Sequence, residues 1–247
     1  MNSKNYSPEN LVAIPPQSLV QFSYLQDTDN YRFAADGAIP EMKLVGFPED
    51  TDYSRSAMLY DGATYRIYFF RQGSNDTLYQ GAFDEDTNVY QYGYASEPVL
   101  RITGAPDGVD YSSFAMLYDG EEYRLYLRPV GAVVKIFQFV YDEDVKAYEH
   151  YAAGQGDWPV QEMPEDADWS GWGMLFDGKT YRLYTWKGGT NHTQIYQAAF
   201  DEEDEVYEFG YDSIPVLNIQ GTPPASYQGG FSMLHDETNY RFYLQTV

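Results

Sequence analysis

The chain of 247 residues contains no cysteine. This absence excludes disulfides, iron–sulfur clusters, thiolate metal sites and cysteine nucleophiles, although it does not settle the cellular compartment. Basic residues are also scarce: 15 lysines and arginines stand against 38 aspartates and glutamates, which gives a formal charge of −23. Nucleic acids and anionic membrane surfaces are bound through basic side chains. The composition therefore argues against both as partners.

Long apolar runs are missing as well. No segment reaches the roughly 18 consecutive apolar residues of a transmembrane helix, and residues 1–8 lack the apolar stretch of a secretory signal. We therefore expect no membrane insertion and recognise no signal peptide. The compartment stays open, with an extracellular or cell-surface location favoured by the ligand class discussed below.

Aromatic side chains, by contrast, are abundant, with 26 Tyr, 14 Phe and 4 Trp, and 43% of the residues are hydrophobic. A disordered acidic chain would be poor in aromatics. The sequence therefore predicts a folded, acidic protein.

A unit of about 58 residues recurs along the chain. Its first half joins an apolar segment, an Asp-Gly turn and a Tyr-Arg-x-Tyr block, and its central methionines are Met58, Met116, Met174 and Met233. Its second half carries a glutamine, at Gln21, Gln80, Gln138 and Gln197. One second half opens the sequence and one first half ends it, so the repeat is circularly permuted relative to the chain ends.

Each unit predicts four short strands, because apolar and polar residues alternate and Tyr, Phe, Val and Ile are enriched. Asp-Gly marks a tight hairpin between the first two strands, and acidic turns join the third and fourth. Four such units predict an all-β protein, a four-bladed β-propeller whose blades of four antiparallel strands surround an axis. The N- and C-terminal strands would share one blade and close the ring. A closed barrel and a stacked β-solenoid are the alternatives.

We expect one domain over residues 1–247, since no half of the repeat array has a closed core. The first blade would take residues 229–247 plus 17–53. The remaining blades would cover residues 54–111, 112–169 and 170–228.

A Gly-x-Pro-x-x-x-Asp lead-in, as at residues 104–110, precedes the apolar strand, the Asp-Gly turn and the aromatic second strand. This order resembles the hemopexin-like four-bladed propellers over most of the chain. The resemblance implies ions in the central channel and suggests heme binding through a histidine. The chain departs from that family in two ways. It lacks the usual Trp-Arg-Tyr-type third strand in shorter blades, and without cysteine it cannot make the disulfide that closes the family's ring.

Three aspartates precede the apolar strands, at Asp52, Asp110 and Asp168, and the fourth equivalent is Ser226. If the strand starts surround the axial opening, these carboxylates would converge and could hold calcium or another hard cation. The resemblance implies the same site. The alternative is that each side chain caps its own turn by accepting hydrogen bonds from nearby amides.

All four tryptophans fall in one window, at Trp158, Trp169, Trp172 and Trp186. The connection before this window, from Gly154 to Trp158, also departs from the repeat. Exposed Trp faces suit sugar rings or an Arg-bearing partner, so we predict a Trp-lined ligand site. Alternatively, Trp169 and Trp172 simply replace Tyr111 and Phe114 of the preceding unit in the core.

The repeated arginines are expected to pair with an Asp or Glu of their own or a neighbouring blade: Arg66, Arg124, Arg182 and Arg241. The repeated glutamines are expected to bond a buried backbone group or a Tyr hydroxyl. The three histidines show no metal-ligand spacing, and no Gly-x-Ser-x-Gly elbow is present. A pair of carboxylates for glycoside hydrolysis stays possible among 38 acids.

The leading functional hypothesis is a non-enzymatic, lectin-like propeller that presents loops to a glycan or a protein. One alternative is a carbohydrate-active hydrolase or lyase. The other is a hemopexin-like protein that binds a metal or heme, with an ion in the axial channel.

Overall fold

The structure, a computed structural model, describes residues 18–35, 41–150, 156–223 and 226–246. Within these ranges the chain forms twenty β-strands joined by turns and contains no helix. It follows that the described part has no helix of the length and apolarity needed to cross a bilayer. Residues 1–8, which carry the expectation about a signal peptide, lie outside the described ranges.

Consecutive strands form four antiparallel groups of four, which we call units 1 to 4. Unit 2 consists of β4 (Thr51–Tyr60), β5 (Tyr65–Arg71), β6 (Thr77–Asp84) and β7 (Val89–Tyr92). Unit 3 consists of β9 (Val109–Tyr118), β10 (Tyr123–Pro129), β11 (Lys135–Asp142) and β12 (Ala147–His150). Unit 4 consists of β14 (Ala167–Phe176), β15 (Tyr181–Lys187), β16 (Gln194–Asp201) and β17 (Val206–Phe209).

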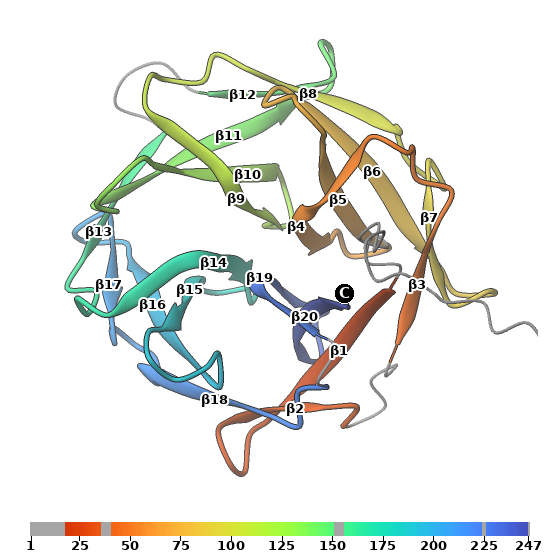
Figure 1. Ribbon diagram of the computed structural model, residues 1–247. Coiled ribbons are helices and arrows are strands. Elements are labelled where there is room, and N and C mark those ends of the chain that lie inside the picture. The colour runs from red at the N-terminus through yellow and green to blue at the C-terminus, as the bar shows by residue number, and fades with distance from the viewer. Residues whose placement is uncertain (1–17, 36–40, 151–155, 224–225, 247) are drawn as a thin grey trace, which may run out of the picture.

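Unit 1 combines strands from both ends of the chain. It consists of β19 (Ser226–His235), β20 (Tyr240–Thr246), β1 (Ser18–Leu25) and β2 (Asn30–Phe33). β20 pairs with β1, so that Gln245 lies opposite Leu19 and Arg241 lies opposite Ser23. In Figure 1 the red strand β1 accordingly runs beside the dark blue strand β20. The permuted repeat predicted this pairing of the two ends.

Each connection between units contains a fifth strand that the sequence did not predict. These strands are β3 (Met42–Val45), β8 (Val99–Thr103), β13 (Asp157–Gln161) and β18 (Val216–Gln220). β8 pairs antiparallel with β6 of its own unit and parallel with β12 of the next unit. The other three repeat this arrangement. Third, fourth and fifth strands therefore form a continuous outer ring of 12 strands, which leaves no free sheet edge between units.

The first strands of the four units, β4, β9, β14 and β19, contact one another in this order around the centre of the ring (Figure 1). The hydrophobic core is divided into four clusters, one between the facing sheets of each pair of neighbouring units. The cluster between units 2 and 3, for example, includes Phe70, Leu100, Phe114 and Tyr148, all of them buried. Packing between neighbouring units therefore depends on these four clusters.

Candidate functional site

Two of the four tryptophans lie in the core. Trp172 and Trp186 are 1% and 0% exposed. The indole nitrogen of Trp172 donates to Oγ of Ser113 over 3.0 Å, and Trp186 packs edge-on against Phe231 at 4.8 Å. The expectation that these two rings face a ligand was therefore wrong for this structure. Their size fills space between units.

The other two tryptophans are partly buried. The indole nitrogen of Trp158 donates to Oε1 of Gln138 over 3.0 Å, and its ring packs edge-on against Phe200 at 5.1 Å. Trp169 lies against Trp172, with ring centroids 6.4 Å apart. The four rings thus do not form one exposed surface. A role in ligand binding for Trp158 or Trp169 stays a prediction.

The three lead-in aspartates are each engaged beside their own strand. Asp52 binds Arg55 at 2.7 Å and the amide of Ser54, and Asp110 binds Arg128 at 2.6 Å. The carboxylate of Asp168 accepts the amide of Ser170 over 2.9 Å. Each aspartate thus accepts a hydrogen bond from an amide two residues further on, as expected for side chains that cap their own turns. The expected convergence on a cation is wrong, because the described residues hold no group of three His, Asp or Glu side chains that could bind a metal ion.

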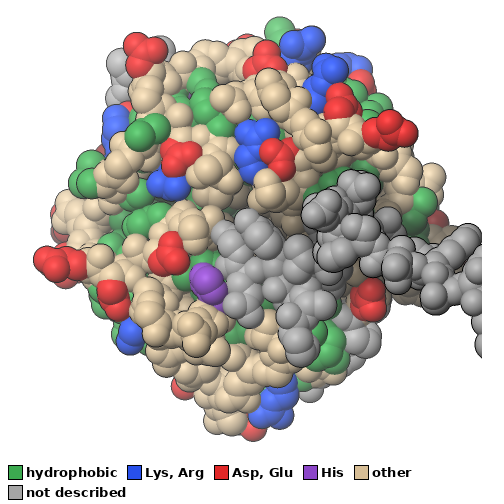
Figure 2. All heavy atoms as spheres, viewed as in Figure 1, with side chains coloured by type: hydrophobic (Ala, Val, Ile, Leu, Met, Phe, Trp, Pro, Cys, Tyr) green, Lys and Arg blue, Asp and Glu red, His purple; other side chains and the backbone are tan. Residues whose placement is uncertain are grey.

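The centre of the ring is packed with apolar side chains at the ends of the first strands. Four of these side chains are each 1% exposed: Leu59, Met116, Met174 and Met233. The space left among them and their neighbours is about 10 Å³. Among the described residues, those that line this gap include no aspartate or glutamate whose carboxylate could hold a hard cation. On the face shown in Figure 2, acidic side chains are scattered and several lie beside Lys or Arg, without a continuous basic patch.

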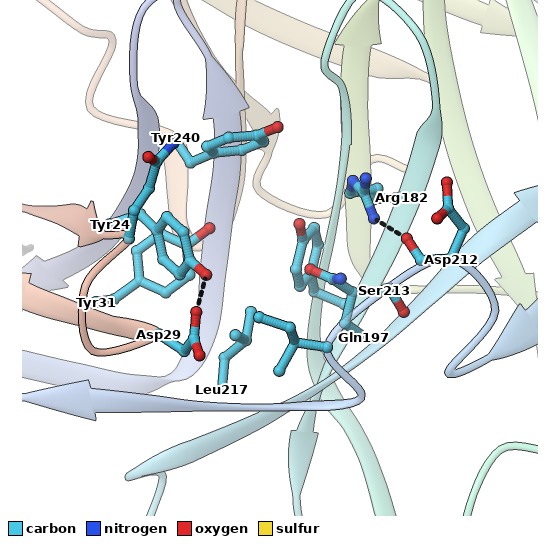
Figure 3. Close-up of a pocket in the computed structure, with 12 residues that line it drawn as sticks. Tyr24, Asp29, Tyr31, Arg182, Gln197, Asp212, Ser213, Leu217 and Tyr240 are labelled. Carbon is cyan, nitrogen blue, oxygen red and sulfur yellow. Dashed lines mark hydrogen bonds between the residues drawn. The ribbon is translucent and has the colours of Figure 1, made fainter.

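A larger cavity opens between units 4 and 1, with about 480 Å³ of space (Figure 3). Unit 1 contributes three tyrosines and an aspartate: Tyr24, Tyr31, Tyr240 and Asp29. Unit 4 and the connection after it contribute polar side chains on the opposite side: Arg182, Tyr184, Gln197, Asp212 and Ser213. The apolar side chain of Leu217 also lines the pocket. The pocket thus combines aromatic walls with convergent polar groups, which is the usual composition of a small-ligand site.

The arginine in this pocket is held from two sides. Its Nε donates to Asp177 of the Asp-Gly turn over 2.8 Å, and its Nη1 donates to the carbonyl of Asp212 over 3.2 Å. The opposite wall is held in turn by Tyr24, whose hydroxyl donates to Asp29 over 2.9 Å. Both sides are therefore fixed before any ligand arrives, which lowers the entropic cost of binding.

A second, smaller pocket of about 210 Å³ lies between units 2 and 3 and repeats eight of the residues that line the first. On the side of the preceding unit, the first pocket has Arg182, Tyr184, Gln197, Ser213 and Leu217, and the second has, in the same order, Arg66, Tyr68, Gln80, Ser96 and Leu100. On the side of the following unit, the first has Tyr240, Tyr24 and Tyr31, and the second has Tyr123, Tyr141 and Tyr148. The arginine is anchored in the same way, with Nε on Asp61 at 2.6 Å and Nη1 on the carbonyl of Ala95 at 3.2 Å. The two pockets lie at alternate boundaries of a ring of four units, and hence on opposite sides of it.

Each pocket is closed by a loop of sequence Gly-Tyr-x-Ser-x-Pro, at residues 93–98 and 210–215. The loop starts and ends on the backbone of the pocket glutamine. The amide of Gly93 donates to the carbonyl of Gln80 over 3.1 Å, and the amide of Gln80 donates to the carbonyl of Pro98 over 3.0 Å. In the other pocket the amide of Gly210 donates to the carbonyl of Gln197, and the amide of Gln197 donates to the carbonyl of Pro215. Gly93 has φ of 67°, a left-handed conformation in which glycine is unstrained.

The serine of this loop is the most informative residue in both pockets. Oγ of Ser96 and Oγ of Ser213 are both buried, and neither has a hydrogen-bond partner among the described residues. A buried hydroxyl without a partner costs about 1–3 kcal/mol, so its occurrence at both equivalent positions points to a ligand or water that completes it. The sequence analysis missed these serines, although the shared Gly-Tyr-x-Ser-x-Pro spacing was visible in two of the four units.

The boundary between units 3 and 4 is filled differently. Trp158 lies opposite Ile136, where Leu100 lies opposite Leu78 and Leu217 lies opposite Ile195. The indole of Trp158 donates to Gln138, which stands at the position of the pocket glutamines Gln80 and Gln197. Residues 36–40 and 151–155, which connect units at the two remaining boundaries, lie outside the described ranges.

Tyrosines in the pockets are kept in their neutral form. Burial is the main cause that raises the pKa of Tyr24, Tyr31 and Tyr184, and for Tyr24 the hydrogen bond to Asp29 adds to it. Neutral phenols both donate and accept hydrogen bonds. The pocket between units 4 and 1 therefore offers hydroxyl, amide and guanidinium groups without an ionised phenol.

The chain matches no protein-family model and no curated protein. Its fold is similar to three solved structures, among others. AofleA from Arthrobotrys oligospora is 13% identical, with 94% of this chain and 63% of that chain covered and a TM-score of 0.36. The Dos1 propeller is 6% identical, with 75% and 40% covered and a TM-score of 0.27. A putative 6-phosphogluconolactonase from Bacteroides fragilis is 12% identical, with 84% and 57% covered and a TM-score of 0.31.

The chain spans less than two thirds of the length of each of these structures. Similarities this weak indicate neither a ligand nor an activity. The resemblance to hemopexin-like propellers stays a prediction, since no family model supports it.

Proposed function

We propose that the chain is a four-bladed β-propeller, with units 1 to 4 as its blades, which binds a neutral glycan in the two pockets between blades and does not catalyse a reaction. The observation that carries this proposal is the duplication of one polar set, Arg, Gln, Ser and Tyr, at two boundaries of the ring. Core packing alone does not require an unpartnered serine hydroxyl at both positions.

The charges in the pockets favour a neutral ligand. Arg182 is already paired with Asp177, whose side chain is 7% exposed, so little positive charge is left to attract an anion. The carboxylate of Asp29 also lines the pocket and would repel one. A ligand with many hydroxyl groups can instead donate to Asp29 and Gln197 and accept from Arg182 and Ser213.

The shape of the pocket favours a sugar over a protein surface. About 480 Å³ lies within the usual range of small-ligand sites, and a recess of this kind admits one or two sugar rings. Tyr24, Tyr31 and Tyr240 on one wall are amphipathic, so they can pack against the C–H groups of a sugar while their hydroxyls bond its oxygens.

Ionisation in the described residues gives no support to the hydrolase alternative. A glycosidase needs a carboxylic acid whose pKa is raised, so that it can protonate the leaving group. The pKa is lowered from its ordinary value at each of the seven carboxyl groups for which a shift is found: Asp50, Asp61, Asp76, Asp119, Asp157, Asp177 and Asp236.

The test is a glycan array followed by titration of the best glycan into the wild type and into Ser213→Ala. Removing the hydroxyl deletes one hydrogen bond to the ligand, worth about 0.5–1.5 kcal/mol, so the affinity of the pocket between units 4 and 1 should fall about 2- to 12-fold, and that of the pocket between units 2 and 3 should not change. Ser170→Ala, a change at an exposed serine outside the pockets, is the matched control and should bind as the wild type does. An array without a bound glycan, or equal affinities of Ser213→Ala and the control, would contradict the proposal.

A further inference from the structure

A third cavity, distinct from the two pockets between units, lies where the ring axis meets the face that carries the Asp-Gly turns. It holds about 330 Å³ and is lined by side chains from all four units. The last residue of each first strand contributes an aromatic ring: Tyr60, Tyr118, Phe176 and His235. We call this cavity the axial mouth.

The four rings of the axial mouth are held in position by a second layer of rings. Each stacks at a tilt on the tyrosine that pairs with it across the hairpin: the centroids are 4.7 Å apart for Tyr60 with Tyr65 and for Tyr118 with Tyr123, and 4.6 Å apart for Phe176 with Tyr181 and for His235 with Tyr240. Those tyrosines in turn bond the aspartates of the neighbouring turns. The aromatic lining is therefore rigid.

The charge of the axial mouth is negative. The described residues that line it include the carboxylates of Asp119, Asp177 and Glu237 and no lysine or arginine. The pKa of Tyr60 is raised, first by burial and then by the charges of Glu237, Asp236, Asp61 and Glu85. Several carboxylates thus act on the same aromatic ring. Asp119 and Asp177 are paired with Arg124 and Arg182, which leaves Glu237 as the exposed carboxylate of the lining.

Below the mouth the axis is closed by the apolar side chains of Leu59, Met116, Met174 and Met233, with about 10 Å³ left between them. A ligand in the mouth would therefore contact aromatic rings at its sides and an apolar floor beneath. The carboxylates of Asp119, Asp177 and Glu237 also line the mouth and add negative charge around such a ligand. Small inorganic cations require several converging oxygen ligands, and the described residues contain no group of three His, Asp or Glu side chains that could provide them.

We propose that the axial mouth binds a small organic cation with a methylated ammonium group. A methylated ammonium is apolar on its outside and positively charged overall, so it is attracted by the faces of aromatic rings and by nearby carboxylates without needing hydrogen bonds. A neutral sugar has no such preference for the mouth over the pockets. The two kinds of site are therefore independent.

The experiment is isothermal titration calorimetry with choline, and in parallel with 3,3-dimethylbutan-1-ol, which has the same shape without the charge. We expect choline to bind and the alcohol to bind at least several-fold more weakly. Tyr60→Leu and Phe176→Leu, which keep apolar bulk, should each weaken choline binding about 2- to 30-fold. Tyr94→Leu, at a tyrosine 41% exposed and outside the mouth, is the control and should bind choline as the wild type does.

Glu237→Gln keeps the test decisive if a ring variant fails to fold, because this exposed side chain can change without loss of packing. It should weaken choline binding and leave the alcohol unaffected. No binding of choline to the wild type at tens of millimolar, equal affinities for choline and the alcohol, or unchanged choline binding in both folded ring variants and Glu237→Gln would overturn the proposal.

Discussion

The hydroxyl of Tyr123 in unit 3 donates across the unit boundary to Oδ2 of Asp61 in unit 2, over 3.2 Å. The same carboxylate binds Nε of Arg66 at 2.6 Å and accepts the amide of Thr64 within its own turn. Equivalent contacts join Tyr181 to Asp119, Tyr240 to Asp177 and Tyr65 to Asp236, at 3.0, 3.2 and 3.1 Å. Each unit thus bonds the turn of the preceding unit, and the set closes around the ring.

Asp177→Asn should destabilise the protein by about 3 kcal/mol. The side chains of Asp177 and Arg182 are 7% and 16% exposed, and removing one partner leaves the other charge poorly solvated. The free energy of unfolding in urea measures the loss. Asp86→Asn, at an exposed turn residue, is the control and should change stability by less than about 0.5 kcal/mol. Equal effects of the two substitutions would contradict the account of the turns.

The same pair predicts a pH dependence. Burial raises the pKa of Asp177, but the hydrogen bond and charge of Arg182 and the turn amides outweigh it, so the pKa is lowered from its ordinary value of 3.8. The folded state therefore binds fewer protons than the unfolded state, and the stabilisation is fully present above about pH 4 and is lost as the pH falls through the folded pKa. Urea unfolding between about pH 6 and 2 should show that the stability gap between the wild type and Asp177→Asn is constant and then narrows. A gap that widens on acidification would refute this.

Alkaline pH tests the buried tyrosine pairs between units. In each pair the two tyrosines are buried and interact with each other: Tyr31 with Tyr184, Tyr90 with Tyr243, Tyr148 with Tyr68 and Tyr207 with Tyr126. Burial is the main cause that raises their pKa above the ordinary value of 10.0. The stability that these neutral phenols contribute is therefore present below about pH 10 and is lost as the pH rises through the folded values.

Phenolate absorbance and circular dichroism, followed together from about pH 8 to 13, measure this effect. We expect exposed tyrosines to ionise near pH 10 and the buried pairs to ionise only at higher pH, together with loss of the β-sheet signal. Ionisation of all 26 tyrosines near pH 10 with the sheet signal intact would contradict the packing between units.

Much of the fold could be predicted from local sequence. Residues that recur along the repeat indicate the Asp-Gly hairpins and the acidic turns. They also indicate the pairing of each repeated arginine with its turn aspartate and the hydrogen bond of Gln138 with Tyr126. The fifth strands were missed because they are short and lie between turn residues. Val99–Thr103, for instance, is flanked by Pro98 and Gly104, and its partner β12 belongs to the next unit.

The site was predicted less well, for a physical reason. Tryptophans are as suitable for filling a gap between sheets as for binding a ligand, and sequence alone does not reveal which of the two a ring does. Trp186 fills such a gap, with 0% exposed. The pockets depend on residues brought together from two units, such as Arg182 and Tyr31, whose proximity only the ring arrangement creates.

The stoichiometry of glycan binding tests the central claim most directly. Ile214 and Glu97 occupy the same position in the two pocket loops and are exposed, so Ile214→Trp and Glu97→Trp should each block one pocket without disturbing the core. Val134→Trp, at a residue 64% exposed away from both pockets, is the control. Calorimetry with the best glycan should give two sites in the wild type and the control, one in each blocked variant and none in the double variant. An unchanged number of sites in the double variant would contradict the claim.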